Sequence, residues 1–211
     1  SHYGKTYFLR CAKRSTNLAS INSSQIKHFP VLLPPLVEQQ KIAQILSTWN
    51  QAIAVTETLL ENSQQQKQAL MQQLLTGKKR LLDENGVRFG GEWKNYALGD
   101  ITSMSSGGTP KSSVVEYYGG DIPWVSIADM TSQGKWILKT ERNLTNLGLE
   151  SSSARLFSKN TILYAMYASI GECSIAKTEL SSSQAILGIK CKNGLHFEFL
   201  YFHLCSLKEK I

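Results

Sequence analysis

The sequence predicts an α+β protein, in which a mixed, largely β domain accompanies one long α-helix. Three observations support this. Residues 37–76 contain no proline or glycine and carry apolar residues at helical spacing. Residues 95–194 form short runs rich in Ile, Val and Tyr, interrupted by Gly, Ser and Asn, which is typical of strands joined by turns. Residues 196–210 return to helical spacing.

The first 35 residues combine a short helix with an extended segment. HYGKTYFLRCAKR, residues 2–14, has helical spacing, and a polar loop follows it. Prolines at positions 30, 34 and 35 permit only an extended chain. The long helix, residues 36–80, starts directly after them. Gly77 is its expected stop, because the three basic residues that follow suit the negative end of a helix dipole.

Alternating steps of four and three residues along the long helix define a coiled-coil seam. Its apolar members are Ile42, Leu46, Trp49, Ile53, Leu60, Leu70 and Leu74, with Thr56, Ser63 and Lys67 between them. A helix of this length is about 60 Å long and about three times the average. A small core cannot cover it, so we expect it to pair with another long helix, from a second copy or from a missing part of the same protein.

The remaining elements belong to the β domain. The expected strands are residues 97–104, 122–127, 134–139, 160–167, 172–177 and 185–191, after a turn-rich linker at residues 83–94. Trp124 lies within one of these strands and is expected in the core. In the helix at residues 196–210, Phe199, Phe202 or His203, and Leu207 are expected to share the buried face.

Charge and cysteine usage narrow the function. Lys and Arg outnumber Asp and Glu by 23 to 16, a formal charge of +7 that favours acidic partners, of which nucleic acid is the commonest. The four cysteines form no CxxC pair and have no histidine at metal-ligand spacing, so no metal site is predicted. Scattered cysteines, with no long apolar segment, favour a reducing, cytoplasmic location.

No catalytic motif emerges. The single Pro-Pro pair lacks the flanking residues of a methyltransferase, and GGTPK lacks the GxxxxGK spacing of a phosphate loop. Asp121 and Asp129 are eight residues apart, which is weak as a nuclease metal site. No GxSxG elbow is present. We therefore expect a protein that is not an enzyme and carries no cofactor.

Residues 103–130 are the best candidate for a binding surface. They combine flexible backbone, hydroxyls, a lysine and three aromatic residues, which suit contacts with phosphates and base edges. The candidate DNA contacts are Ser106, Gly107, Thr109, Lys111 and Tyr117. The alternative is a glycine-rich hairpin region whose tyrosines are simply core. Two further polar clusters are YAMYASIG, residues 164–171, and SSSQA, residues 181–185.

Several stretches together resemble the specificity subunit of type I restriction–modification systems. They are GGTPK with YYGGDIPWVSIADM, NTILYAMYASIGECSIAK, SSSQAILGI, FPVLLPPLVEQQKIAQIL and LLTGKKRL. The resemblance implies a target recognition domain that reads one half of a split double-stranded DNA target. It also implies a spacer helix that pairs antiparallel with a second one. Such a subunit is not an enzyme. It docks modification subunits, which methylate adenine with S-adenosylmethionine, and restriction subunits can join them.

By this resemblance, Tyr118, Ser182 and Gln184 join the five candidate DNA contacts. The order of segments departs from a single family repeat, because the helix precedes most of the recognition domain. The chain is a central excerpt of a longer subunit, a circularly permuted half-subunit, or a truncated product. An excerpt would leave exposed strand edges, which favours one domain made of residues 88–211 and closed by residues 1–35. Two copies would then pair their helices as a homodimer. The alternative function is a coiled-coil scaffold without specific DNA binding.

Overall fold

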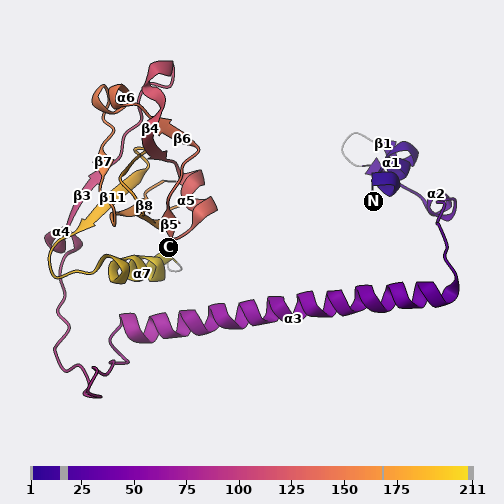
Figure 1. Ribbon diagram of the computed structural model, residues 1–211, viewed down its shortest axis with the longest axis horizontal. Coiled ribbons are helices and arrows are strands. Elements are labelled where there is room, and N and C mark those ends of the chain that lie inside the picture. The colour runs from indigo at the N-terminus through magenta and orange to yellow at the C-terminus, as the bar shows by residue number, and fades with distance from the viewer. Residues whose placement is uncertain (1, 15–18, 168, 209–211) are drawn as a thin grey trace. The chain divides into compact units, whose positions relative to one another are not determined.

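The computed structural model describes residues 2–14, 19–167 and 169–208 (Figure 1). The chain divides into two compact units, residues 1–63 and residues 64–211. We call them the N-terminal unit and the sheet unit. The architecture is α+β with one long helix, as the sequence predicts.

The N-terminal unit has a small aromatic centre. Its elements are α1 (His2–Cys11), β1 (Lys13–Arg14), β2 (Ala19–Ser20), α2 (Ser23–Lys27) and the first part of α3 (Leu36–Leu75). Phe8 stacks on Phe29 with ring centroids 5.0 Å apart, and Tyr7 meets the same ring edge-on. A capping box of Asn22 and Gln25 starts α2. The aromatic contacts therefore join α1 to the segment that precedes α3.

Helix α3 is bounded by the residues that the sequence indicates. The amides of Glu38 and Gln39 donate to the Pro35 carbonyl, at 2.9 and 3.0 Å. At the other end, Gly77 adopts a φ of +71°, and its amide donates to the Leu74 carbonyl at 3.2 Å. This left-handed position favours glycine. The helix ends at Leu75, two residues before the expected stop at Gly77 and within the expected segment 36–80.

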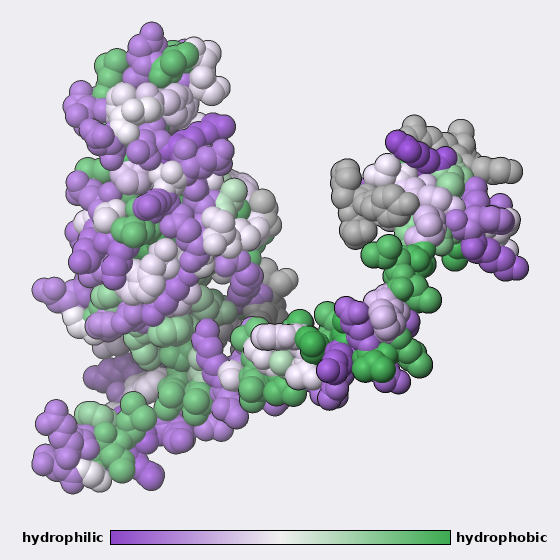
Figure 2. Space-filling model, turned by 45° about the vertical axis from the view of Figure 1, so that its right-hand side comes forward, coloured by the Kyte–Doolittle hydropathy of each residue, from purple (hydrophilic) through white to green (hydrophobic). Residues whose placement is uncertain are grey.

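Apolar side chains are exposed along much of the length of α3, interspersed with polar ones (Figure 2). None of its residues is buried. Gln39 is half-buried near the start of the helix, and Met71, Leu74 and Leu75 are half-buried toward its C-terminal end, in the part that belongs to the sheet unit.

The sheet unit contains two mixed sheets. The strands are β3 (Thr102–Ser106), β4 (Tyr118–Val125), β5 (Trp136–Ile137), β6 (Arg142–Leu144), β7 (Leu156–Phe157), β8 (Ile162–Ala165), β9 (Cys173–Ala176), β10 (Leu180–Ser182) and β11 (Ile186–Cys191). One sheet has the order β6-β4-β10-β7 and the other β3-β11-β8-β9-β5. The β4–β10 and β5–β9 pairs are parallel, and the other pairs are antiparallel.

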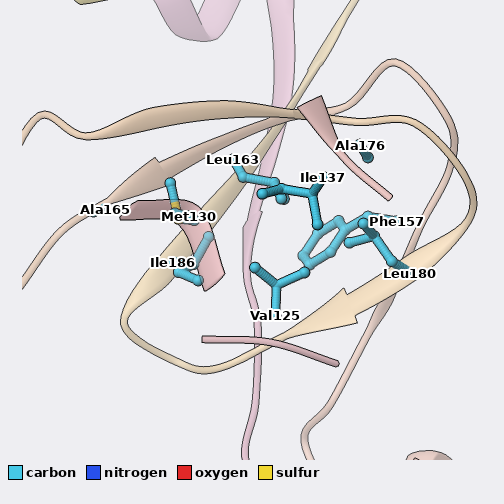
Figure 3. Close-up of a cluster of buried hydrophobic side chains, with 9 residues drawn as sticks. All are labelled: Val125, Met130, Ile137, Phe157, Leu163, Ala165, Ala176, Leu180 and Ile186. Carbon is cyan, nitrogen blue, oxygen red and sulfur yellow. The ribbon is translucent and has the colours of Figure 1, made fainter. Parts of the chain in front are cut away.

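The main core draws side chains from both sheets and from α5 (Ile127–Gln133) (Figure 3). Its members are Val125, Met130, Ile137, Phe157, Leu163, Ala165, Ala176, Leu180 and Ile186. A Cβ on Gly188 would lie 2.2 Å from the ring of Phe157. The aromatic ring therefore takes the space that a side chain on β11 would need.

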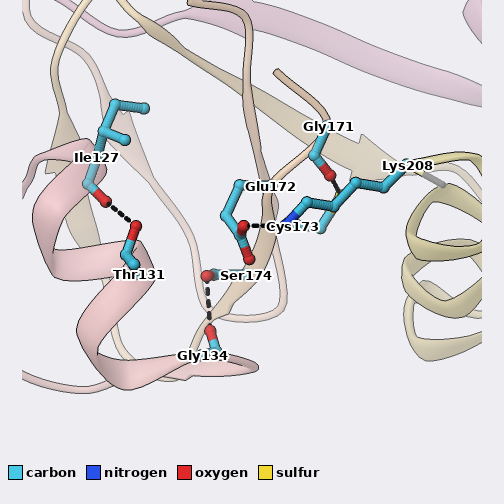
Figure 4. Close-up of polar contacts among 8 residues, drawn as sticks. All are labelled: Ile127, Thr131, Gly134, Gly171, Glu172, Cys173, Ser174 and Lys208. Carbon is cyan, nitrogen blue, oxygen red and sulfur yellow. Dashed lines mark hydrogen bonds and ion pairs between the residues drawn. The ribbon is translucent and has the colours of Figure 1, made fainter. Parts of the chain in front are cut away.

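Helix α7 (Phe197–Lys208) belongs to a second core on the other side of the five-stranded sheet. Leu200 and Leu204 are buried there with Ile162, Cys173 and Ile189. The expected buried face was wrong by one position, because Phe199 and Leu207 remain exposed by 42% and 39%. An ion pair from Lys208 to Glu172 ties the end of the helix to the residue before β9 (Figure 4).

Five of the six expected strands are shorter in the structure, and the strand expected at residues 122–127 begins and ends earlier, as β4. Residues 98–101 form α4 (Leu98–Ile101), a single turn ahead of β3. β4 ends at Val125 because Ser126 and Asp129 form a capping box that starts α5. Only two residues of 134–139 pair as a strand. The sheet unit also contains β6, β7, β10, α5, η1 (Val115–Tyr117) and α6 (Asn146–Glu150), for which the sequence had given no expectation.

Candidate nucleic-acid interface

The GGTPK loop, residues 107–111, leaves β3 and lies between the two sheets. The Gly107 amide donates to the Ile186 carbonyl of β11 at 3.0 Å. The Gly108 amide donates to the Ser182 carbonyl of β10 at 2.9 Å. The loop backbone is therefore bonded to one strand of each sheet.

Both glycines are required by close backbone approach. A Cβ on Gly107 would lie 2.3 Å from the Ser182 carbonyl oxygen. A Cβ on Gly108 would lie 2.4 Å from the backbone nitrogen of Ala154. Both distances are far below van der Waals contact, so any side chain would displace the loop. These glycines hold the loop in place, and their role is structural.

Two aromatic side chains donate hydrogen bonds to carbonyl groups of the loop. The indole Nε1 of Trp124 donates to the Gly108 carbonyl at 3.0 Å. The Tyr118 hydroxyl donates to the Pro110 carbonyl at 2.8 Å. Trp124 is only 7% exposed, which confirms its expected place in the core. Its hydrogen bond to the loop gives it a second role, which the strand pattern alone did not indicate.

The side chains that the loop exposes are polar. Thr109 and Lys111 are exposed, and so is Gln184, which follows β10. The Thr109 hydroxyl donates to the side-chain oxygen of Gln184. The structure thus joins two candidate residues that are 75 positions apart in the sequence. Hydroxyl, amide and ammonium groups on a fixed backbone can bond base edges and phosphates.

The other candidates occupy supporting or peripheral places. Ser106 is exposed at the end of β3, where it pairs with Leu187. Tyr117 is half-buried in η1, and its carbonyl accepts from the Thr145 amide at 3.0 Å. Ser182 is fully buried against Gly107. Its side chain is therefore not available on this surface.

Sequence reasoning missed Arg155. It directly follows Ala154, whose backbone packs on Gly108, and it is exposed. The antiparallel pairing of β7 with β10 sets Leu156 opposite Ser181. Continuing this register by one residue places Arg155 near Ser182. A single arginine after a run of serines gives no periodic signal. Only the strand pairing brings this cation to the loop.

A small pocket is lined by Trp124, Ser126, Asp129, Glu141 and Arg142. The Asp129 carboxylate accepts hydrogen bonds from the Ser126 amide at 2.9 Å, the Ser126 hydroxyl at 2.7 Å and the Glu141 amide at 2.9 Å. These bonds hold the turn after β4 against the start of β6. The carboxylate thus has a structural task.

Within residues 2–14, 19–167 and 169–208, no three His, Cys, Asp or Glu side chains gather in a group that could hold a metal ion. A search of the same residues finds no helix that is both long and apolar enough to span a membrane.

The sequence matches a known protein family over most of its length. Residues 4–63 and 90–211 match the model of the type I restriction modification DNA specificity domain. The chain belongs to this family. The match covers the long helix as far as residue 63 and, from residue 90 onward, both sheets with the GGTPK loop.

Two archaeal specificity subunits of Methanocaldococcus jannaschii are similar in sequence. The putative MjaX subunit is 28% identical over 220 residues, which cover 98% of this chain and 48% of that protein. The MjaIX subunit is 37% identical over 112 residues, 53% of this chain and 26% of that protein. This specificity-family chain thus spans about half the length of the relative that it matches throughout.

Solved structures agree on the fold. The HsdS subunit of Thermoanaerobacter tengcongensis has 18% identity and a TM-score of 0.53, over 97% of this chain and 51% of that chain. The S subunit of a type I system from M. genitalium has 17% identity and a TM-score of 0.57, over 96% of this chain and 50% of that chain. The specificity-subunit fold is therefore shared along nearly the whole sequence.

Proposed function

We propose that this chain is the DNA-recognition part of a type I restriction–modification complex, in which the sheet unit reads one half of a split target. The observation that carries the proposal is the GGTPK loop. Its backbone is bonded to both sheets, while Thr109, Lys111 and Gln184 remain exposed. Membership of the specificity family and the formal charge of +7 support it.

The proposal divides the candidate residues by task. Thr109, Gln184 and Ser106 bond base edges or sugars, and Lys111 and the newly found Arg155 contact phosphates. Tyr117 lies at the margin of this surface. Gly107, Tyr118 and Ser182 hold the loop, because their atoms are buried or bonded to its backbone.

The chain itself supplies no chemistry in this proposal. Modification subunits dock on it and methylate adenine with S-adenosylmethionine, and restriction subunits join that complex. Methyl transfer by this chain in the absence of any partner would contradict this division of labour.

Pairing of α3 with α3 of a second copy is the proposed route to a two-fold assembly and a palindromic split target. Its support is the exposed apolar seam, since Leu46, Trp49 and Ile53 are exposed by 59%, 66% and 54%. Leu74 is half-buried, so the seam is proposed to run from Ile42 to Leu70.

Closure of the recognition domain by residues 1–35 is a proposal with its own test. Leu32 is 98% exposed in the N-terminal unit. A photo-crosslinking amino acid at this position should be recovered attached to residues 88–211 by mass spectrometry. Recovery of crosslinks only within residues 1–63 would contradict closure.

The decisive experiment is a gel shift of the chain assembled with a partner modification subunit, on a panel of DNAs. The target for the panel comes from methylation mapping in a host that carries the system. We expect one target to be bound with a specificity ratio of about 10³ or more over unrelated DNA. Equal binding to every DNA would refute sequence recognition.

A protein-interaction scaffold is the second candidate, favoured by the long run of exposed apolar residues on α3. In that case the helix is the function and the basic charge is incidental. The same gel shift separates the two, because a scaffold would assemble with its partner and yet add no sequence preference to the complex.

A further inference from the structure

The end of α3 is joined to the sheet unit through one aromatic side chain, Trp93. Its indole lies over Gly77, where an ideal Cβ would be only 3.2 Å from the ring. The Arg80 guanidinium lies over the same ring, 5.6 Å from its centroid. On α7, the ring of Phe199 meets the indole edge-on at 6.2 Å. Trp93 therefore contacts both the helix stop and α7.

The segment between Gly77 and Trp93 is folded back by its own hydrogen bonds. The Phe89 amide donates to the Leu81 carbonyl at 3.1 Å, and the Asp83 amide donates to the Val87 carbonyl at 2.8 Å. An Arg80 guanidinium nitrogen also donates to the Gly91 carbonyl at 2.9 Å. These bonds return the chain to the helix stop. They hold Trp93 in position without a long excursion.

The last turns of α3 also lie close enough to α7 for a charge on α3 to act on it. The pKa of the Cys205 thiol on α7 is lowered to about 7, mainly by a hydrogen bond from Cys173. The Lys67 ammonium on α3 adds to this lowering. Met71 and Leu75, one and two turns further on, are half-buried. The last turns of α3 are therefore part of the sheet unit, as its boundary at residue 64 also indicates.

We infer that Trp93 is a positioning residue that fixes the direction in which the spacer helix leaves the recognition domain, and so sets the gap length of the split target. This inference rests on the proposed function, because a gap exists only if two domains are held apart. The contact is suited to the task, since edge-to-face and cation–π contacts depend on orientation.

The first test needs no DNA. Spin labels on non-natural amino acids at Gln66 of α3 and Thr178 of the sheet unit leave the native cysteines unmodified; both positions are exposed. Gln66 is about 15 Å along the helix from its end, so a change of direction moves the label by several ångströms. We expect one narrow distance distribution in the unsubstituted chain and a broadened one in Trp93→Ala.

The matched control is Phe89→Ala, which removes an aromatic side chain of similar exposure (55% against 50%) from the same segment. It should leave the distribution narrow. Arg80→Lys, which keeps the charge but not the planar group, should broaden it less than Trp93→Ala. A narrow distribution in Trp93→Ala, or a broad one before any substitution, would overturn the inference whatever the DNA results are.

The second test uses the complex with modification subunits and targets whose half-sites differ in gap length. We expect the unsubstituted complex to methylate one gap length strongly, and Trp93→Ala to raise methylation at neighbouring gaps by up to about tenfold relative to the preferred one. An unchanged gap preference in Trp93→Ala would refute the role of Trp93 but leave the proposed function intact. Absence of any sequence preference in the unsubstituted complex would refute the proposed function instead.

Discussion

Helix α3 and the sheet unit differ in how far their apolar residues are exposed to solvent. On α3, Leu60 and Ile53 are exposed by 59% and 54%, whereas Leu163 and Ile186 in the sheet unit are fully buried. The sheet unit satisfies its apolar side chains within its own chain. The long helix leaves its own to be covered by something else. The sheet unit thus forms a core within its own chain, whereas the apolar side chains of α3 are exposed and available for contact with a partner.

The largest effect is expected when charges are placed in the apolar seam of α3. Ile53→Asp with Leu60→Asp places carboxylates where two helices would meet, so we expect a dimer to become a monomer. Each lost apolar contact is worth about 1.5–3 kcal/mol. The dissociation constant should then rise by about a thousandfold or more. Light scattering measures the mass directly.

The matched control for the helix is Gln51→Asp with Thr58→Asp. These two positions lie seven residues apart, as Ile53 and Leu60 do, but on the side of α3 away from the seam. The control should keep the dimer mass and the helical circular dichroism. An unchanged mass in the seam variant would mean that the seam is wrongly assigned.

In the sheet unit, the corresponding substitution is Gly107→Ala, which disrupts the packing of the GGTPK loop. The added methyl would lie 2.3 Å from the Ser182 carbonyl oxygen, which is backbone and cannot rotate away. We expect a loss of about 2 kcal/mol in the free energy of unfolding, as is usual for overpacking. Urea unfolding monitored by tryptophan fluorescence measures it, because Trp124 donates to the same loop.

Gly90→Ala is the control for this loss, since nothing lies within 4 Å of its added Cβ. Its unfolding free energy should stay within about 0.5 kcal/mol of the unsubstituted chain. Equal losses in the two variants would indicate that the GGTPK loop is not held by close packing.

A smaller effect is expected from Lys111→Ala, which removes one cation from the exposed surface of the loop. Binding of all DNA sequences should weaken, and the slope of log K against log salt should fall by about one. Lys190→Ala is the control, because Lys190 pairs opposite Ser103, three residues before the loop end of β3. An unaltered slope in Lys111→Ala would remove Lys111 from the phosphate contacts.

The smallest expected effect is a chemical difference between two cysteines of the sheet unit. A hydrogen bond from Cys173 lowers the pKa of Cys205 to about 7, whereas burial raises the pKa of Cys191. Alkylation of Cys205 should reach half its maximal rate near pH 7, and Cys191 should react only at higher pH. Peptide mass spectrometry after timed alkylation distinguishes the two sites.

The sign of the linked stability change follows from the lowered pKa of Cys205. Between pH 7 and the ordinary thiol pKa of 9.0, the unfolded chain holds this proton more often than the folded chain does. The stabilisation is therefore present above this interval and lost as the pH falls toward 7. Cys173→Ala should raise the alkylation midpoint of Cys205. A midpoint that does not move would exclude the hydrogen bond as the cause.

The sequence allowed the long helix to be predicted closely, because proline and glycine mark its two ends and both act locally. It also supplied the position of the GGTPK loop. It did not supply the tasks of Ser182 and Arg155, which depend on how β10 pairs with β7 and β4. The buried face of α7 was off by one residue, since several aromatic residues in a row make its periodicity ambiguous.

The way in which the GGTPK loop is anchored has a consequence for engineering. Its fixed points are backbone atoms of residues 107 and 108 and the carbonyl of Pro110, none of which depends on the side chains at positions 109, 111 and 184. The side chains at those three positions can therefore be randomised to select new DNA specificities while the rest of the domain stays folded. Because Thr109 bonds Gln184, these two are best varied together.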